Sequence, residues 1–312
     1  MKTFLMPGTD LTVPAVVAGM MRIEELDDAA IRKLVDAAIA DGVYFFDHAD
    51  IYGDDTHGCE TRFGQALKLT PSQRESLVLQ TKCGIVIGDD VTSYDFSYRH
   101  ILDSVDGSLK ALRTDYIDIL LLHRPDALME PDEVARAFNA LQESGKVRWF
   151  GVSNHTPGQI ELLKRSVTQP LVANQVQISL THCPAIAQGL AANMSWIDQA
   201  QSRDAGMVDY CRLHDITMQA WSPFQNPDWT GTFIGNPDQP DLNAMLDRLA
   251  AEYHVTPTGI ATAWLTRHPA NMQVVAGTTK PFRIHEIAQG ADLTLTRPEW
   301  YGLFEASGHE IP

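Results

Sequence analysis

Eight short apolar segments alternate with amphipathic segments along the 312-residue chain, and this alternation limits the possible folds more than any other feature. The eight segments are rich in β-branched or aromatic residues, as strands are. The strand candidates are Val13–Ala18, Val43–Phe46, Leu77–Thr81, Ile117–Leu122, Trp149–Val152, Val172–Val176, Thr217–Ala220 and Gln273–Ala276. The helix candidates are Leu26–Ala40, Glu60–Leu69, Ser97–Leu112, Asp132–Ser144, Pro157–Arg165, Ala205–His214, Leu242–Arg267 (read as two helices) and Pro281–Ala288.

Strands that alternate with helices indicate parallel strands joined by right-handed crossovers. Eight such units predict an α/β fold of the closed (β/α)8 TIM barrel type. An open doubly wound sheet commonly carries GxGxxG after its first strand, whereas here the sequence continues Gly19-Met20-Met21. No low-complexity segment or linker interrupts the chain, so residues 1–312 are predicted to form one domain.

The charge balance excludes several classes of partner. The chain has 24 basic and 40 acidic residues, a net charge of -16, which repels nucleic-acid phosphates and anionic membranes. No apolar run approaches the roughly 18 residues of a membrane helix, and Met1–Pro7 lacks the apolar core of a signal peptide. The cysteines form no CxxC pair; they are Cys59, Cys83, Cys183 and Cys211. A reducing cytoplasmic location is therefore expected.

Polar or aromatic residues directly follow most of the predicted strands. Active sites of (β/α)8 barrels lie at the carboxyl ends of the strands, so these residues are expected to share one mouth. In strand order they are Asp47, Lys82, His123, Ser153 with Asn154, Gln175 and Trp221.

Three of the residues near this mouth, with Tyr52, form a plausible acid site. The ordinary pKa of tyrosine is near 10, and an adjacent Lys82 ammonium would lower the pKa of Tyr52 by favouring tyrosinate. Asp47 would orient Lys82 through a charge-assisted hydrogen bond. His123 could donate a hydrogen bond to a carbonyl oxygen. Such a site suits carbonyl reduction, in which a cofactor supplies hydride to carbon.

The order and spacing of these motifs resemble the aldo-keto reductase family over Gly19 to Ala288. The matching motifs are Asp47-x4-Tyr52-Gly53, Lys82, His123, Gly151-Val152-Ser153-Asn154, Asn174-Gln175 and Ala276-Gly277-Thr278-Thr279-Lys280-Pro281-Phe282-Arg283-Ile284. The Met20-Met21-Arg22 run is similar to the bacterial oxidoreductase branches of the family. The resemblance implies an NAD(P)H-dependent reductase of a small-molecule aldehyde or ketone, with Asp47, Tyr52, Lys82 and His123 as a catalytic tetrad and Tyr52 as proton donor.

The same resemblance implies the cofactor contacts. Ser153, Asn154 and Gln175 would bind the nicotinamide carboxamide, and Trp221 stands where the family stacks an aromatic ring. The remaining implied contacts are Gly19, Met20, Ser222, Pro223, Phe224, Thr278, Lys280 and Arg283. The cationic Lys280 and Arg283 favour the 2′-phosphate of NADPH. NADH remains an alternative, because Gly277 stands where many family members carry Lys.

Other readings of these residues stay open. A cofactor-holding sensor or partner subunit would show little turnover. Ser153 and Asn154 could instead cap the helix at Pro157. A metal-dependent hydrolase would need a metal-binding cluster. The candidate residues are His48, Asp50, Asp54, Asp55, His57, Cys59 and Glu60, which are better interpreted as a solvated loop with no metal.

The sequence does not indicate the substrate or the oligomeric state. Specificity is expected from the loops Gly84–Tyr94, Thr181–Arg203 and Ser222–Pro240, with Trp196, Trp229 and Phe233 suggesting an apolar pocket.

Overall fold

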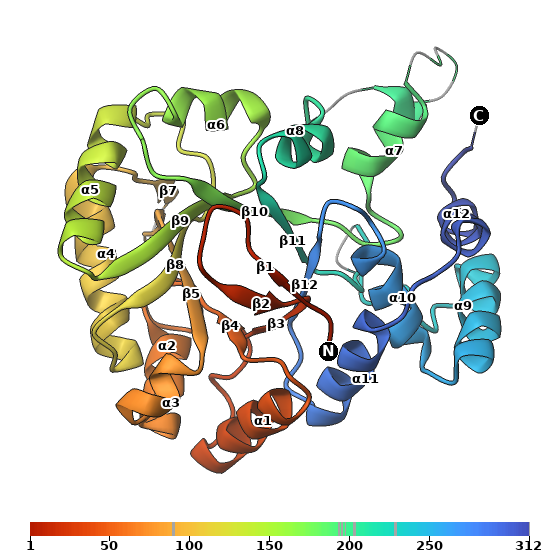
Figure 1. Cartoon of the computed structure of the whole chain (residues 1–312), viewed down its shortest axis with the longest axis horizontal. Coiled ribbons are helices and arrows are strands. Elements are labelled where there is room, and N and C mark those ends of the chain that lie inside the picture. The colour runs from red at the N-terminus through yellow and green to blue at the C-terminus, as the bar shows by residue number, and fades with distance from the viewer. Residues whose placement is uncertain are drawn as a thin grey trace.

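The computed structural model describes residues 1–88, 91–192, 194, 196, 198–201, 204–227 and 230–311 and confirms the predicted closed barrel of eight parallel strands (Figure 1). The strands, in barrel order, are β3 (Val16–Gly19), β4 (Phe45–Asp47), β5 (Val78–Cys83), β8 (Ile117–Leu122), β9 (Val147–Ser153), β10 (Leu171–Gln177), β11 (Thr217–Trp221) and β12 (Gln273–Ala276). Pairing of β12 with β3 closes the barrel.

Helices surround this barrel on its outer face (Figure 1). They are α1 (Asp28–Ala40), α2 (Gly58–Leu67), α4 (Tyr98–Leu112), α5 (Pro131–Glu143), α6 (Pro157–Leu163), α8 (Met207–Leu213), α9 (Pro240–Tyr253), α10 (Pro257–Thr266) and α11 (Pro281–Ala291). Pro131, Pro157 and Pro281 each occupy a first-turn position, where the missing N–H costs nothing. The segment Leu242–Arg267 divides into two helices as expected, because His254 adopts a left-handed conformation that ends α9.

The prediction of one strand over Val13–Ala18 is wrong. Residues Thr12–Pro14 form β2, which pairs antiparallel with β1 (Thr3–Leu5), and the barrel strand begins only at Val16. The backbone N–H of Ala15 donates to Lys2, while its carbonyl accepts from Val274 of the barrel, so the chain changes partners at this residue. The β1–β2 hairpin contributes Val13 to a buried cluster with inward-facing strand residues and thus covers one end of the barrel.

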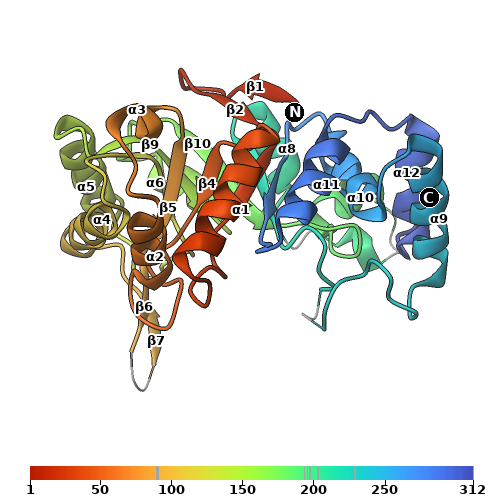
Figure 2. The same cartoon turned by 90° about the horizontal axis from the view of Figure 1, so that it is seen from below.

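A second hairpin lies at the opposite end of the molecule (Figure 2). Strands β6 (Ile85–Ile87) and β7 (Thr92–Tyr94) form it within the segment expected to be a loop. The expected loop Thr181–Arg203 likewise contains α7 (Pro184–Leu190) and the 3-10 turn Asp198–Ala200. Helices α3 (Pro71–Glu75) and α12 (Arg297–Ala306) were also not predicted. Most of these elements are too short to show a hydrophobic period.

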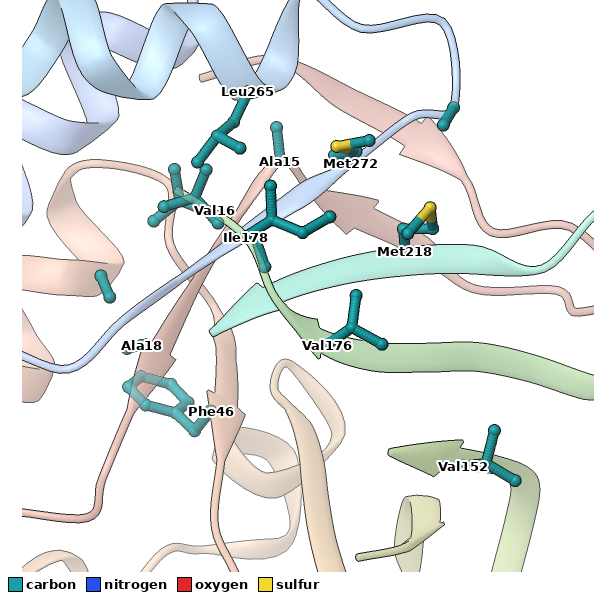
Figure 3. Packing of buried hydrophobic residues seen from close by; sticks show 14 of the residues in the cluster. Ala15, Val16, Ala18, Phe46, Val152, Val176, Ile178, Met218, Leu265 and Met272 are labelled. Carbon is teal, nitrogen blue, oxygen red and sulfur yellow. The ribbon is translucent and has the colours of Figure 1, made fainter. Parts of the chain in front are cut away.

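The core follows from the two-residue alternation of strand side chains. In β3, Val16 and Ala18 pack outward toward the helices, whereas Val17 faces the barrel interior. Val16, Ile178, Met218 and Met272, all labelled in Figure 3, belong to the same buried hydrophobic cluster. Both faces of the barrel strands are therefore buried, which explains their continuous apolar sequence. Across the described residues, no helix is long and apolar enough to span a membrane.

Candidate active site

A cavity of about 480 Å³ lies at the carboxyl ends of the barrel strands. Of the predicted site residues, it is lined by Gly19, Asp47, Tyr52, His123, Ser153, Asn154, Gln175, Trp221, Ser222, Pro223, Phe224, Thr278 and Arg283. Three others do not line it. Lys82 is fully buried beneath the cavity floor, Met20 is buried in the core, and Lys280 is exposed at the start of α11.

Lys82 connects the acidic and phenolic groups of the site. Its Nζ atom donates to Asp47 Oδ2 at 2.7 Å, to the His48 carbonyl at 2.7 Å and to the Tyr52 hydroxyl oxygen at 3.1 Å. A lysine ammonium has three donors, and all three are used. The Tyr52 oxygen therefore accepts from Lys82, which leaves the phenolic proton free to be donated elsewhere.

Burial changes the pKa values expected from the sequence. Burial raises the pKa of Tyr52 above its usual value and outweighs the lowering by the Lys82 ammonium, so the expectation of a lowered pKa is wrong for the protein alone. Burial would lower the pKa of Lys82, but the Asp47 carboxylate and the contacts with Tyr52 raise the pKa above its usual value. Lys82 is thus held as a cation next to a neutral phenol.

His123 faces Tyr52 across the cavity. The two rings meet edge-on with centroids 5.8 Å apart. Burial, followed by the charges of Lys82 and Arg124, holds the pKa of His123 well below its usual value. The imidazole is therefore neutral at neutral pH, with one N–H able to donate to a carbonyl oxygen.

The wall formed by β9, β10 and β11 is built from side-chain hydrogen bonds. Ser153 Oγ donates to the Gln175 carbonyl at 2.8 Å, and Asn154 Nδ2 donates to Ser153 Oγ at 2.9 Å. Trp221 Nε1 donates to Asn154 Oδ1 at 3.0 Å. The alternative helix-capping role of Ser153 and Asn154 is wrong, because Thr156 caps α6. These contacts fix the polar side chains along this wall of the cavity.

The part of the cavity that follows β12 has room and positive charge. A Cβ atom added at Gly277 would meet no described atom within 4 Å, so the backbone there is open. Arg283 lines the cavity at the first turn of α11, and Thr278, which directly follows Gly277 in the sequence, lines it too. A guanidinium at a helix N-terminus is a favourable environment for a phosphate group. The cavity lining thus combines amide and hydroxyl groups with a guanidinium, which fits a ligand that carries both an amide and a phosphate.

The polar cluster after the second barrel strand is not the solvated loop that the sequence suggested. Asp54 and Asp55 are exposed, but His48, Asp50, Cys59 and Glu60 are buried. His57 Nδ1 lies 2.6 Å from Glu60 Oε2, and Thr81 donates to the other Glu60 oxygen at 2.5 Å. Within the described ranges, no group of three or more His, Cys, Asp or Glu is arranged to hold a metal ion.

The predicted aromatic pocket residues lie elsewhere. Phe233 is fully buried in the core, Trp196 is 76% exposed, and neither lines the cavity. Trp229 is outside the described residues. Apolar walls come instead from Ile51, Ile85 and Ile234, which carried no signal in the sequence beyond their place in loops.

The fold and the site together define a (β/α)8 barrel protein with a buried Asp–Lys–Tyr cluster and a neutral histidine at the mouth. A family model described as "Aldo/keto reductase family" matches residues 15–305, and the chain belongs to this family.

Similar proteins agree with this assignment. The chain is 36% identical to the uncharacterized oxidoreductase YcsN of Bacillus subtilis (strain 168), over 97% of each chain. It is 34% identical to a 6-dehydroglucose reductase of Agrobacterium fabrum, over 96% of this chain and 97% of that one. A solved aldo/keto reductase from Klebsiella pneumoniae, in complex with NADP and acetate, has the same fold, with a TM-score of 0.74 at 23% identity over 97% and 94% of the two chains. Bacterial oxidoreductase relatives confirm the predicted branch.

Proposed function

We propose that the protein is an NADPH-dependent reductase that converts an aldehyde or ketone to an alcohol, with Tyr52 as proton donor. The observation that carries the proposal is the position of Lys82 Nζ, within hydrogen-bond distance of both Asp47 and the Tyr52 hydroxyl. Tyr52 and His123 both line the cavity above it. A carbonyl oxygen held between these two rings would meet one proton donor and one hydrogen-bond donor.

Each residue has a distinct role in this reaction. When bound, NADPH supplies a hydride to the carbonyl carbon. Tyr52 gives its phenolic proton to the carbonyl oxygen, and His123 donates a hydrogen bond to the same oxygen as negative charge develops there. The Lys82 ammonium stabilises the tyrosinate that remains, and Asp47 keeps Lys82 in place. The products are an alcohol and NADP⁺.

The cavity residues fit this cofactor by their chemistry. Ser153, Asn154 and Gln175 would recognise the nicotinamide carboxamide, and Trp221 would stack on its ring. Arg283, with weaker help from the exposed Lys280, would pair with the 2′-phosphate, which is why NADPH is preferred over NADH. The NADP bound in the Klebsiella pneumoniae protein supports this choice.

Three further parts of the proposal concern the substrate, the location and the partners. The relative named 6-dehydroglucose reductase suggests oxidised sugars among the carbonyl compounds to test. Four buried free cysteines are consistent with a reducing cytoplasmic location. The net charge of -16 does not favour a nucleic-acid partner.

The test is a spectrophotometric assay of NADPH oxidation with a panel of aldehydes, ketones and oxidised sugars. We expect carbonyl-dependent turnover that persists after treatment with a chelator. Titration with NADPH should quench tryptophan fluorescence more in the parent than in Trp221→Phe, because Trp221 lines the proposed nicotinamide site. Tight NADPH binding without turnover on any panel member would instead support a sensor or partner subunit. NADPH oxidation that is lost on chelation and restored by zinc or manganese would contradict the metal-free reductase mechanism.

A further inference from the structure

Four glutamine side chains meet inside the barrel below the candidate active site. They come from four strands: Gln80 from β5, Gln175 from β10, Gln219 from β11 and Gln273 from β12. Each is at most 3% exposed. Strands β5 and β11 are not neighbours in the barrel order and lie on different sides of it (Figure 1), so the contact between Gln80 and Gln219 crosses the interior.

The amides form a continuous hydrogen-bonded ladder that ends on Asp47. Gln80 Nε2 donates to Asp47 Oδ1 at 2.6 Å and to Gln219 Oε1 at 2.9 Å. Gln175 Nε2 donates to the same two acceptors at 3.2 and 3.1 Å. Gln219 Nε2 donates to Gln80 Oε1 and to Gln273 Oε1, both at 3.0 Å. The far end is Gln273 Nε2, which donates to the Pro14 carbonyl at 2.7 Å.

The two ends of the ladder determine the orientation of every amide. An ionised carboxylate and a backbone carbonyl are both acceptors only, so Gln80 and Gln175 must turn their NH₂ groups toward Asp47, and Gln273 must turn its NH₂ group toward Pro14. The Gln219 amide then has one orientation that satisfies the buried polar groups. In this orientation its oxygen accepts from Nε2 of Gln80 and from Nε2 of Gln175. Gln219 thereby holds both donors against Asp47 by accepting a hydrogen bond from each of them.

We propose that Gln80 and Gln219 are positioning residues. By holding N–H donors on Asp47, they weaken the electrostatic effect of its carboxylate on Lys82 and Tyr52. This inference rests on the proposed function and extends it to residues outside the cavity lining. Two N–H donors on Oδ1 disperse the negative charge of Asp47, whose other oxygen accepts from Lys82. Without these donors, Asp47 attracts the Lys82 ammonium more strongly, and Lys82 stabilises tyrosinate less.

The direction of the effect follows from the charged neighbours. Asp47 raises the pKa of Tyr52, and Lys82 lowers it. A less dispersed charge on Asp47 therefore raises the pKa of Tyr52 further. The other ionisable groups around this cluster are His48 after β4, Cys59 on α2, and His123 and Arg124 after β8. None of them is altered by changing Gln80 or Gln219.

The experiment compares Gln80→Met and Gln219→Met with the parent and with Gln169→Met. Gln169 is a matched control, a buried glutamine that bonds Asn139 outside the barrel. Two readouts are taken: the pH profile of kcat for carbonyl reduction, and the ultraviolet tyrosinate titration of each protein minus that of its Tyr52→Phe counterpart. We expect the alkaline limb of kcat and the Tyr52 titration to move upward by roughly half a pH unit or more in both ladder variants, and not in Gln169→Met.

The outcomes separate this inference from the proposed function. Unchanged Tyr52 titration in the folded ladder variants overturns the inference, whatever their activity. A parent that reduces no carbonyl compound contradicts the proposed function, while the ultraviolet titration still tests the ladder. If Gln219→Met does not fold, Gln219→Asn takes its place, because it withdraws the amide by one methylene. We expect it to shift the Tyr52 titration in the same direction. A Tyr52 titration equal to that of the parent in this variant also overturns the inference.

Discussion

The rings of Tyr52 and His123 meet edge-on with centroids 5.8 Å apart, and Lys82 approaches the Tyr52 hydroxyl from below at 3.1 Å. The phenol is therefore surrounded by a neutral imidazole on the cavity side and an ammonium on the buried side. This arrangement lets the phenolic proton leave toward the cavity while the tyrosinate is stabilised from beneath.

Removal of the Tyr52 hydroxyl separates chemistry from binding. Tyr52→Phe should lower kcat for carbonyl reduction by about 10²–10⁴-fold, the usual contribution of a positioned proton donor. The dissociation constant for NADPH should stay near the parental value. Steady-state kinetics and fluorescence titration measure the two quantities. Tyr44→Phe is the control, since Tyr44 bonds the Thr12 carbonyl near the β1–β2 hairpin. Near-parental turnover in Tyr52→Phe would show that another group supplies the proton.

Replacement of Lys82 tests the buried ion pair. Lys82→Met leaves the Asp47 carboxylate buried without its cation, which should cost about 3–5 kcal/mol in the free energy of unfolding. The same variant should lose the alkaline limb that Tyr52 ionisation gives to kcat. Urea unfolding and a pH profile provide the measurements. The double variant Lys82→Met, Asp47→Asn should regain part of the stability, because the unpaired charge is gone. Parental stability in the single variant would contradict the ion-pair geometry.

The preference for NADPH should depend on Arg283. Arg283→Gln should raise the dissociation constant for NADPH by roughly 10-fold or more, as expected for loss of a charge-assisted bond to phosphate. The constant for NADH should change little, because NADH lacks the 2′-phosphate. Fluorescence titration with both cofactors measures the effect, with the exposed Arg248→Gln as control. Equal losses for both cofactors would place Arg283 away from the 2′-phosphate.

Asp50 should make stability depend on pH. Burial, with the nearby Glu60, raises the pKa of Asp50 from 3.8 to about 7. Because the folded pKa exceeds the unfolded one, its favourable contribution is complete below pH 3.8 and is lost as the pH rises through about 7. Asp50→Asn carries no charge, so its stability relative to the parent should increase by about 4 kcal/mol between pH 4 and pH 8. Thermal melts across this range test it, with exposed Asp54→Asn as control. A pH-independent difference would show that Asp50 is not ionising in this range.

The sequence by itself determined the architecture and the main site residues. Eight apolar runs separated by helical periods indicate a parallel barrel, because strand burial on both faces requires them. Asp47, Lys82 and His123 could be placed near one mouth, because parallel strands present their carboxyl ends on the same side. The prolines at the helix starts were equally readable from local chemistry.

Only the tertiary structure decided how these groups act on one another. The sequence placed Lys82 near Tyr52 but could not weigh the ammonium against burial, which raises the pKa of the phenol. It also gave no sign that Gln80 and Gln219, 139 positions apart, would meet. The local sequence pattern indicates which face of a strand is apolar. The burial of Tyr52 and the contacts across the barrel depend instead on closure of the sheet, to which all eight strands contribute together.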